Sequence, residues 1–161
     1  MKLFSTLSSA LVLAASLLVA GCNNSSTSAP VKTTSALVSV EAITAGAKGF
    51  TVGSPMSART VYVFFDAQCP HCSALWYAAK PLKSQAKFVW IPVGILNGAS
   101  TSQGATILAA SDPVAAMETH EASMMSKGGG ISATADADAQ KDAIKKNTEL
   151  MTSFGFASIP T

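Results

Sequence analysis

The sequence predicts a single α/β domain built around a strand–helix–strand unit with parallel strands. Residues 61–65, Val-Tyr-Val-Phe-Phe, are β-branched or aromatic throughout, which is typical of a strand buried on both faces. Helix-forming residues follow as far as Lys80, and residues 88–91 form a second apolar run. A strand, a helix and a strand of these lengths favour a right-handed connection between parallel strands.

The segments around this unit predict a lead-in and three further helices. Residues 36–43 alternate loosely and residues 49–52 are β-like, so we expect a lead-in hairpin. Residues 102–110 have helical composition, and residues 138–154 carry an apolar stripe at helical spacing. A helix over 112–126 begins with Asp-Pro, an N-cap residue followed by a first-turn proline.

The N-terminus is typical of a bacterial lipoprotein signal peptide. Lys2 precedes an apolar run over residues 10–20, which is shorter than the ~20 residues that span a bilayer. Residues 19–22, Val-Ala-Gly-Cys, resemble a lipobox, which predicts a diacylglycerol group on Cys22. An ordinary signal peptide is the alternative. Asn23 stands where an aspartate would favour the inner membrane, so we expect the outer membrane.

Composition indicates the domain boundaries and argues against a nucleic-acid partner. After the signal at 1–21, residues 22–36 are rich in Ser, Thr and Asn, which predicts a flexible tether. Residues 37–161 then form one domain. The net charge is +2, and no basic cluster exceeds Lys145-Lys146, which we expect on a solvated helix face. A nucleic-acid partner is not expected, because it normally requires a basic patch or stripe.

Two cysteines follow the first strand directly, in the tetrad Cys69-Pro70-His71-Cys72. A disulfide between them closes too small a loop to stabilise the fold strongly, so a reactive role is favoured. Proline suits the first turn of a helix, which places Cys69 at a helix N-terminus, where unpaired N–H groups and the helix dipole favour a thiolate. We predict that Cys69 is the nucleophile and that Cys72, one turn later and more buried, resolves the mixed disulfide.

The two residues between the cysteines are expected to tune the redox potential. His71 can place a cation or a hydrogen bond beside the Cys69 thiolate, and Pro70 stiffens the turn, so we expect an oxidising site. Two other interpretations remain. The tetrad can be half of a zinc site, although outside it only His120 and scattered carboxylates are available as ligands. It can also be a chance pair in a binding protein.

Other polar and sulfur-containing residues are expected to play smaller roles. His120 is predicted to lie on a helix surface beside Glu118 and Glu121. Asp66 is predicted to cap the turn before the tetrad; the alternative is that it steers protons near the thiols. One group of methionines is expected to serve helix packing, with a soft-metal site as the alternative: Met117, Met124 and Met125.

With these motifs, residues 49–161 resemble the C-terminal thioredoxin-fold domain of the DsbC/DsbG family of periplasmic disulfide isomerases, closer to the DsbG side. In that superfamily a loop with a cis-proline packs against the redox disulfide and binds the substrate backbone. The resemblance assigns Pro160, with Ile159 before it, to that loop. The matching residues are the strand at 61–66, Trp76, Pro81, Ser-Asp-Pro at 111–113, Phe154-Gly155 and the final Ile-Pro-Thr at 159–161.

The sequence departs from the family in three ways. Pro-His is the dipeptide of the DsbA-type oxidases, whereas the isomerases usually carry an aromatic residue there. Residues 35–57 are too short to supply the family's N-terminal dimerisation domain, so we expect a monomer, or a different association, that acts as an oxidase or reductase. The family fold continues after the cis-proline with a strand pair and a helix, while the printed sequence ends at Thr161. The resemblance therefore predicts a thioredoxin-like fold with a helical insertion that lacks its C-terminal strand pair and helix.

The sequence thus predicts an exported, lipid-anchored thiol–disulfide oxidoreductase on the periplasmic side of a bacterial membrane. Its expected partners are exported proteins with thiols or disulfides and a redox partner, which is a membrane protein or another exported thioredoxin-like domain. No metal and no organic cofactor are expected. The alternative is a thioredoxin-like binding or chaperone module with little redox turnover, which should lose nothing when both cysteines become serine.

Overall fold

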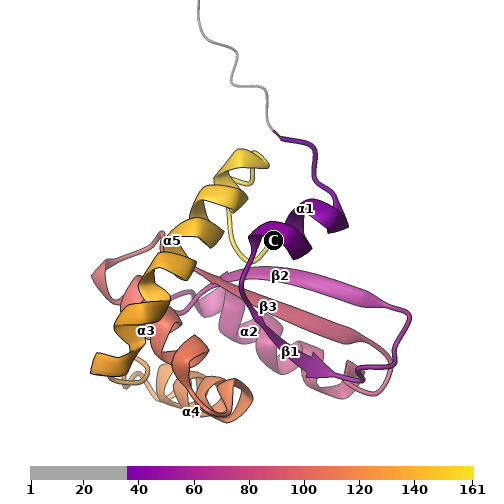
Figure 1. Cartoon of the computed structure of the whole chain (residues 1–161). Helices are drawn as coiled ribbons and strands as arrows, with labels where there is room; N and C mark the ends of the chain where they lie inside the picture. Colours follow the sequence, from indigo (N-terminus) through magenta and orange to yellow (C-terminus); the bar gives the residue numbers. More distant parts are fainter. Residues whose placement is uncertain (1–35) are drawn as a thin grey trace, which may run out of the picture. The chain divides into compact units, whose positions relative to one another are not determined.

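The computed structural model describes residues 36–161, so the predicted signal at 1–21 and nearly all of the predicted tether lie outside the described residues. Figure 1 shows the order of the elements along the chain. They are α1 (Val40–Gly46), β1 (Phe50–Gly53), β2 (Thr60–Asp66), α2 (Pro70–Ala79), the 3-10 turn η1 (Lys80–Leu82), β3 (Lys87–Val93), α3 (Gly98–Ala109), α4 (Pro113–Met125), the 3-10 turn η2 (Ala135–Ala137) and α5 (Asp138–Ser153). None of the helices described is both long and apolar enough to cross a membrane.

The strands form one sheet in the order β1-β3-β2. β2 and β3 are parallel, with Thr60 opposite Lys87 and Asp66 opposite Val93. The predicted parallel strand–helix–strand unit is therefore confirmed, and the carboxyl ends of β2 and β3 lie side by side. β1 pairs with the other edge of β3 and runs antiparallel to it.

Helices cover both faces of this sheet (Figure 1). The side chains of β2 alternate between the two faces, as the two-residue period of a strand requires. Val63 and Phe65 belong to the core on the α2 side, together with Trp76. Phe64 belongs to the core on the opposite side, where its ring centroid lies 6.5 Å from that of Phe154, the residue that follows α5. The site at the end of β2 thus stands on a strand that is buried on both faces.

The predicted lead-in hairpin is wrong in its first half. Residues 40–46 form helix α1, because the Ser39 side chain accepts the backbone N–H of Ala42 as an N-cap and Ile43 is buried in the core. The second half, β1, is a strand as predicted, but it pairs with β3 and not with a neighbouring segment: Phe50 lies opposite Trp90.

The three helices predicted after β3 are confirmed, with shifted boundaries. α3 starts at Gly98 and not at residue 102, because the Asn97 side chain accepts the N–H of Ala99 at 2.8 Å and forms a capping box. Asp112 caps α4 as predicted, and Gly155 ends α5 with a positive φ of 77°. These residues fix where α3 and α4 begin and where α5 ends.

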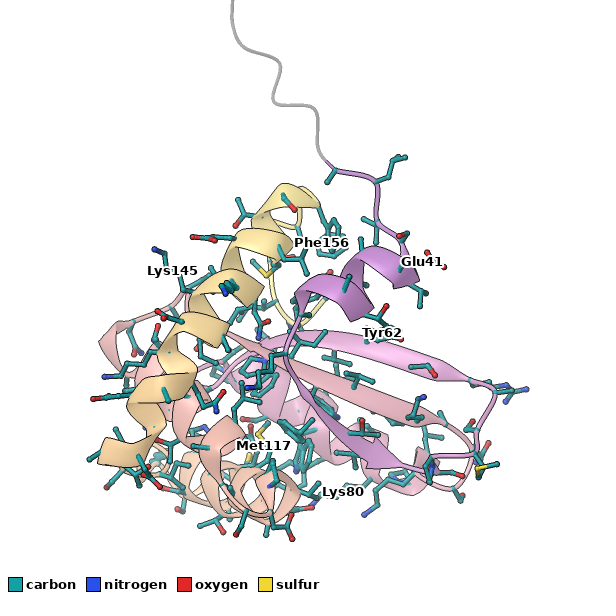
Figure 2. The ribbon with its side chains drawn as sticks, in the orientation of Figure 1. Glu41, Tyr62, Lys80, Met117, Lys145 and Phe156 are labelled. Carbon is teal, nitrogen blue, oxygen red and sulfur yellow. The ribbon has the colours of Figure 1, made fainter. Side chains whose placement is uncertain are left out.

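The methionines of α4 divide between core and surface. Met117 is fully buried, and Figure 2 shows it on the side of α4 that faces the sheet. Met124 is half-buried. The predicted role in helix packing is wrong for Met125, which is 65% exposed because it lies one position past the inward face of the helix. Lys145 points away from the protein on α5, as predicted for a solvated helix face.

Candidate redox site at the start of α2

Cys69 is the N-cap residue of α2. Its backbone is extended, with φ −96° and ψ 114°, and its Sγ accepts the backbone N–H of Cys72 at 3.3 Å. Pro70 follows as the first helical residue, where its missing N–H leaves no hydrogen bond unmade. The sulfur of Cys69 therefore lies in the N-cap position, against the first N–H groups of α2 and the positive end of the helix dipole.

The two cysteines differ in their surroundings. Cys69 is 4% exposed and Cys72 is 0% exposed, whereas Pro70 and His71 are exposed on the surface. Burial raises the pKa of the Cys72 thiol well above its ordinary value of 9.0, and the hydrogen bond with Cys69 raises it further. Cys72 therefore holds its proton more tightly than an ordinary thiol, which favours Cys69 as the attacking sulfur.

The segment with the cis-proline lies against Cys69. The Ile159–Pro160 peptide bond is cis, and the Cys69 thiol donates to the carbonyl oxygen of Ile159 at 3.9 Å. Thr161 holds this segment on the outer edge of β2: Phe64 N–H donates to Thr161 O at 2.8 Å, and Thr161 N–H donates to Phe64 O at 3.2 Å. The structure thus brings residues from the two ends of the predicted site together, although 90 residues separate them along the chain.

Asp66 caps the turn before the tetrad, as predicted, and also ties it to the next loop. Its side chain is fully buried. One carboxylate oxygen accepts the N–H of Gln68 at 2.9 Å, and the other accepts those of Ile95 at 2.7 Å and Leu96 at 3.1 Å. Because Ile95 and Leu96 follow β3, this one carboxylate fixes the ends of both parallel strands at the turn before Cys69.

The prediction that His120 lies on a surface is wrong. His120 and its neighbour Glu121 are 0% and 1% exposed. Their burial follows from position and not from polarity: counted from Met117, the positions i+3, i+4 and i+7 lie on one face of a helix, and these are His120, Glu121 and Met124. That spacing was the signal in the sequence that marks these two polar residues as inward-facing.

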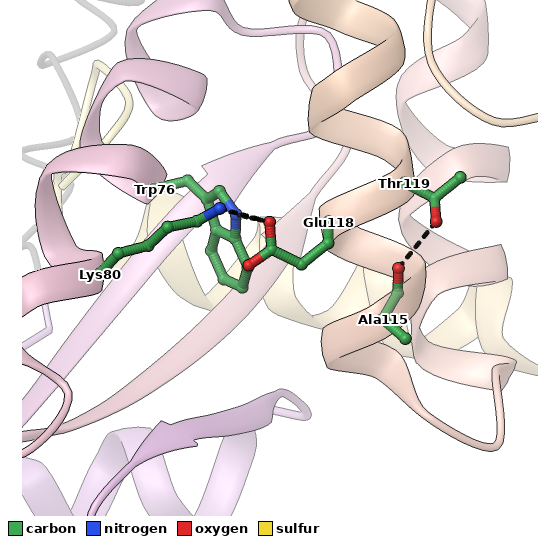
Figure 3. Close-up of polar contacts among 5 residues, drawn as sticks. All are labelled: Trp76, Lys80, Ala115, Glu118 and Thr119. Carbon is green, nitrogen blue, oxygen red and sulfur yellow. Dashed lines mark hydrogen bonds and ion pairs between the residues drawn. The ribbon is translucent and has the colours of Figure 1, made fainter.

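α2 and α4 meet through polar side chains. Glu118 of α4 accepts hydrogen bonds from the Lys80 ammonium and, at 3.4 Å, from the indole N–H of Trp76 (Figure 3). Burial opposes ionisation of Glu118, but these bonds outweigh it and its pKa is lowered. Nearer the redox centre, burial raises the pKa of Glu121, which lies beside Ser73 and whose Oε2 has no hydrogen-bond partner among the described residues.

Among residues 36–161, no group of three or more His, Cys, Asp or Glu side chains is placed to hold a metal ion. The zinc interpretation therefore gains no ligand set there. Cys22, the predicted lipidation site, lies outside the described residues.

The fold is thioredoxin-like: it has a mixed sheet in the order β1-β3-β2, a Cys-Pro-His-Cys tetrad at the N-terminus of α2 and a cis-proline beside the tetrad. No family model matches the chain. The sequence is 34% identical to the thiol:disulfide interchange protein DsbG of Pseudomonas aeruginosa over 105 residues, which is 63% of this chain. The chain spans only 40% of the length of that protein. The predicted resemblance to the DsbC/DsbG proteins is thus confirmed over the matched residues, where the chain is similar to DsbG.

Solved structures agree on the fold. The catalytic domain of ScsC from Proteus mirabilis is 16% identical and superposes with a TM-score of 0.53 over 74% of this chain and 82% of that domain. A thioredoxin-like oxidoreductase from Silicibacter pomeroyi is 20% identical, with a TM-score of 0.57 over 76% of this chain and 83% of its own. The predicted thioredoxin-like α/β fold is therefore confirmed.

Proposed function

We propose that this chain is a thiol–disulfide oxidoreductase whose redox centre is Cys69 and Cys72. One observation carries the proposal: the sulfur of Cys69 accepts an N–H at the start of α2 and also lies 3.9 Å from the carbonyl that precedes a cis-proline. A nucleophilic sulfur needs a stabilised thiolate, a second sulfur nearby and a place for substrate. The similarity to DsbG supports the same chemistry.

The exchange has two steps. The Cys69 thiolate attacks one sulfur of a substrate disulfide, a bond forms between these two sulfurs, and the other substrate sulfur leaves as a thiolate. Cys72 then gives up its proton and attacks Cys69, which forms the Cys69–Cys72 disulfide and releases the second substrate thiolate. The substrate gains two electrons and the centre loses them. The reverse sequence oxidises a substrate dithiol.

The neighbouring residues are proposed to set the potential and to hold substrate. His71 is exposed within the tetrad, and its imidazole is proposed to donate a hydrogen bond to the Cys69 sulfur, which would make the centre more oxidising. Pro70 starts the helix without an unpaired N–H. Ile159 and Pro160 lie against Cys69 and are proposed to bind the backbone of the substrate next to its reacting cysteine.

A redox titration tests this function. The full chain is equilibrated in glutathione buffers of graded potential, free thiols are trapped by alkylation, and peptide mapping assigns each trapped thiol. We expect one two-electron transition in which Cys69 and Cys72 titrate together. With Cys72→Ser, a mixed disulfide between Cys69 and glutathione should accumulate. Independent alkylation of both thiols at every potential would refute the proposal and would favour a binding module.

We further propose that the chain acts outside the cytoplasm as a lipid-anchored monomer that works with exported thiol proteins and a redox partner. The signal-like residues 1–21 and the lipobox-like Cys22 support export and lipidation. Mass analysis of the mature N-terminus should find diacylglycerol on Cys22, and Cys22→Ser should move the protein from the membrane fraction to the soluble one. A membrane-bound Cys22→Ser protein would contradict the anchor.

A further inference from the structure

We propose that His120 is a positioning residue for the nucleophilic sulfur: its imidazole holds the peptide chain just before Cys69 in the conformation that keeps the sulfur at the helix N-cap. The inference rests on the proposed redox function. It concerns a buried histidine of the helical insertion, which here means helices α3 and α4. The exchange steps themselves do not use this histidine. His120 lies 51 positions along the chain from Cys69 (120 − 69), so the contact is tertiary and not local.

Both ring nitrogens of His120 are engaged. Nε2 lies 2.6 Å from the carbonyl oxygen of Ala67, and the backbone N–H of Ile131 donates to Nδ1 at 3.2 Å. Because Nδ1 accepts, the proton of a neutral ring is on Nε2, which donates to Ala67. Burial lowers the pKa of His120, which keeps this neutral form in place. The imidazole is therefore a bridge between the redox turn and the loop after α4.

The loop after α4 is shaped to receive that ring. Gly130 has a positive φ of 90°, and a Cβ there would lie 2.4 Å from Cε1 of His120. A glycine is thus required both for the backbone conformation and for the close approach of the imidazole. The loop therefore leaves room for the imidazole where it is. A histidine that was buried only for its apolar area would not need a glycine at that point.

A second side-chain bridge runs parallel to the first. Gln103 of α3 is buried and donates to Gly129 O at 2.8 Å and to Ile131 O at 2.9 Å, and its own oxygen accepts from the Gln68 side chain. Gln68 directly precedes the nucleophile. Helices α3 and α4 therefore both hold the residues just before Cys69. Gln103 of α3 bonds to the Gln68 side chain, and His120 of α4 bonds to the buried carbonyl of Ala67.

The consequence for Cys69 follows from the geometry of the turn. Ala67 is 1% exposed, so its carbonyl loses its partner if the imidazole is removed, and a buried unpaired carbonyl favours rotation of the peptide toward water. The Cys69 N–H is bonded to Asp66 O at 3.0 Å across the same turn. A rotation at Ala67 therefore shifts the sulfur of Cys69 away from the Cys72 N–H. Losing an N-cap contact typically costs about 1 kcal/mol, which is about fivefold in the equilibrium between the thiol and disulfide forms of Cys69 and Cys72.

Three substitutions in the full chain separate positioning from general stability. His120→Phe fills the space without either bond; His120→Gln can still donate to Ala67; His120→Asn can accept from Ile131 but is too short to reach Ala67. Thr119→Ala, on the exposed side of the same helix, is the matched control. Its hydroxyl donates to Ala115 O and to no other group among the residues described (Figure 3). The readouts are the alkylation rate of Cys69 at pH 7 and the glutathione equilibrium constant of the Cys69–Cys72 couple.

We expect His120→Phe and His120→Asn to slow Cys69 alkylation about fivefold and to shift the glutathione equilibrium toward the disulfide by a similar factor. His120→Gln and Thr119→Ala should stay close to the parent. If His120→Phe does not fold, the comparison of Gln with Asn decides, and equal values for those two overturn the inference. Folded Phe and Asn variants with the parent's rate and equilibrium constant also overturn it. If the parent itself shows no two-electron transition, the proposed function fails instead.

Discussion

Replacing Asp66 by asparagine tests the idea that one buried carboxylate joins the ends of β2 and β3 at the redox turn. The substitution keeps the size of the side chain and removes its charge. It also replaces one of the two accepting oxygens by an NH₂ group, which cannot accept a backbone N–H. The Asp66 side chain is buried, and all three donors are main-chain groups in partly buried bonds, so none of them can turn to a new partner without moving the chain.

The expected cost follows from the bonds that are lost. The one oxygen that the asparagine side chain retains would best occupy the position that serves Ile95 and Leu96, which leaves the N–H of Gln68 facing an NH₂ group. One lost charge-assisted bond at a partly buried donor costs about 1.5–3 kcal/mol, and the two surviving bonds weaken by about 0.5 kcal/mol each when the acceptor becomes neutral. The sum is about 2.5–4 kcal/mol, a large part of the ~5–15 kcal/mol that stabilises a typical domain.

Urea denaturation of the full chain, with both cysteines reduced, measures this cost as a change in the free energy of unfolding. Asp112→Asn provides the control, because Asp112 also accepts two backbone N–H groups, both at 3.0 Å, but from an exposed position at the start of α4. Asparagine is as good an N-cap as aspartate, so this variant should lose less than about 1 kcal/mol. Equal losses for the two variants, or a loss below about 1 kcal/mol for Asp66→Asn, would refute the reasoning.

Three other expectations follow from the same set of contacts. Burial raises the pKa of Glu121 above its ordinary 4.5, so the folded state binds this proton more tightly and stability falls as pH rises from 4.5 through the folded pKa. Glu121→Gln should therefore be more stable than the parent at pH 7 and nearly equal to it at pH 4. A stability difference in urea denaturation that does not grow with pH contradicts this. The Lys80–Glu118 pair is 34% and 38% exposed, so Lys80→Met should cost no more than about 1 kcal/mol and less at high salt; a larger, salt-independent loss argues against a surface pair. Burial and the Cys69 hydrogen bond are the main causes of the raised pKa of Cys72, and the charge of Asp66 is a minor one. In a Cys69→Ser background, Asp66→Asn should therefore speed the alkylation of Cys72. An unchanged or slower rate would contradict the claim that the Asp66 charge raises this pKa.

The parts of the fold that the sequence predicts well are those with local causes. β2 is an unbroken run of β-branched and aromatic residues, and α2 begins where a proline suits a first helical turn. The caps at Asp112 and Gly155 likewise act within a few residues of themselves. Because the redox tetrad stands between two such elements, its position at the start of a helix is predictable without any tertiary information.

The lead-in segment could not be predicted in the same way. β1 has four residues, and its strand partner is β3, about 40 positions further on, with Phe50 opposite Trp90. Nothing near Phe50 in the sequence specifies that pairing, which depends on burying its ring against Phe65 and Trp76. α1 has only seven residues, too few for a clear helical period, so its Ser39 cap and the burial of Ile43 decide its structure.

The burial of His120 beside the turn before Cys69 was missed because polarity is a poor guide to burial when hydrogen-bond partners are available. A polar side chain is tolerated in a core if its donors and acceptors are paired, and both nitrogens of His120 are. An apolar face on α4 would pack against α2 in several registers, since dispersion contacts are not directional. A hydrogen bond to one particular carbonyl has a single register. The bond from His120 to Ala67 therefore fixes where α4 sits relative to the turn before Cys69, which an apolar face of the same size would leave undetermined.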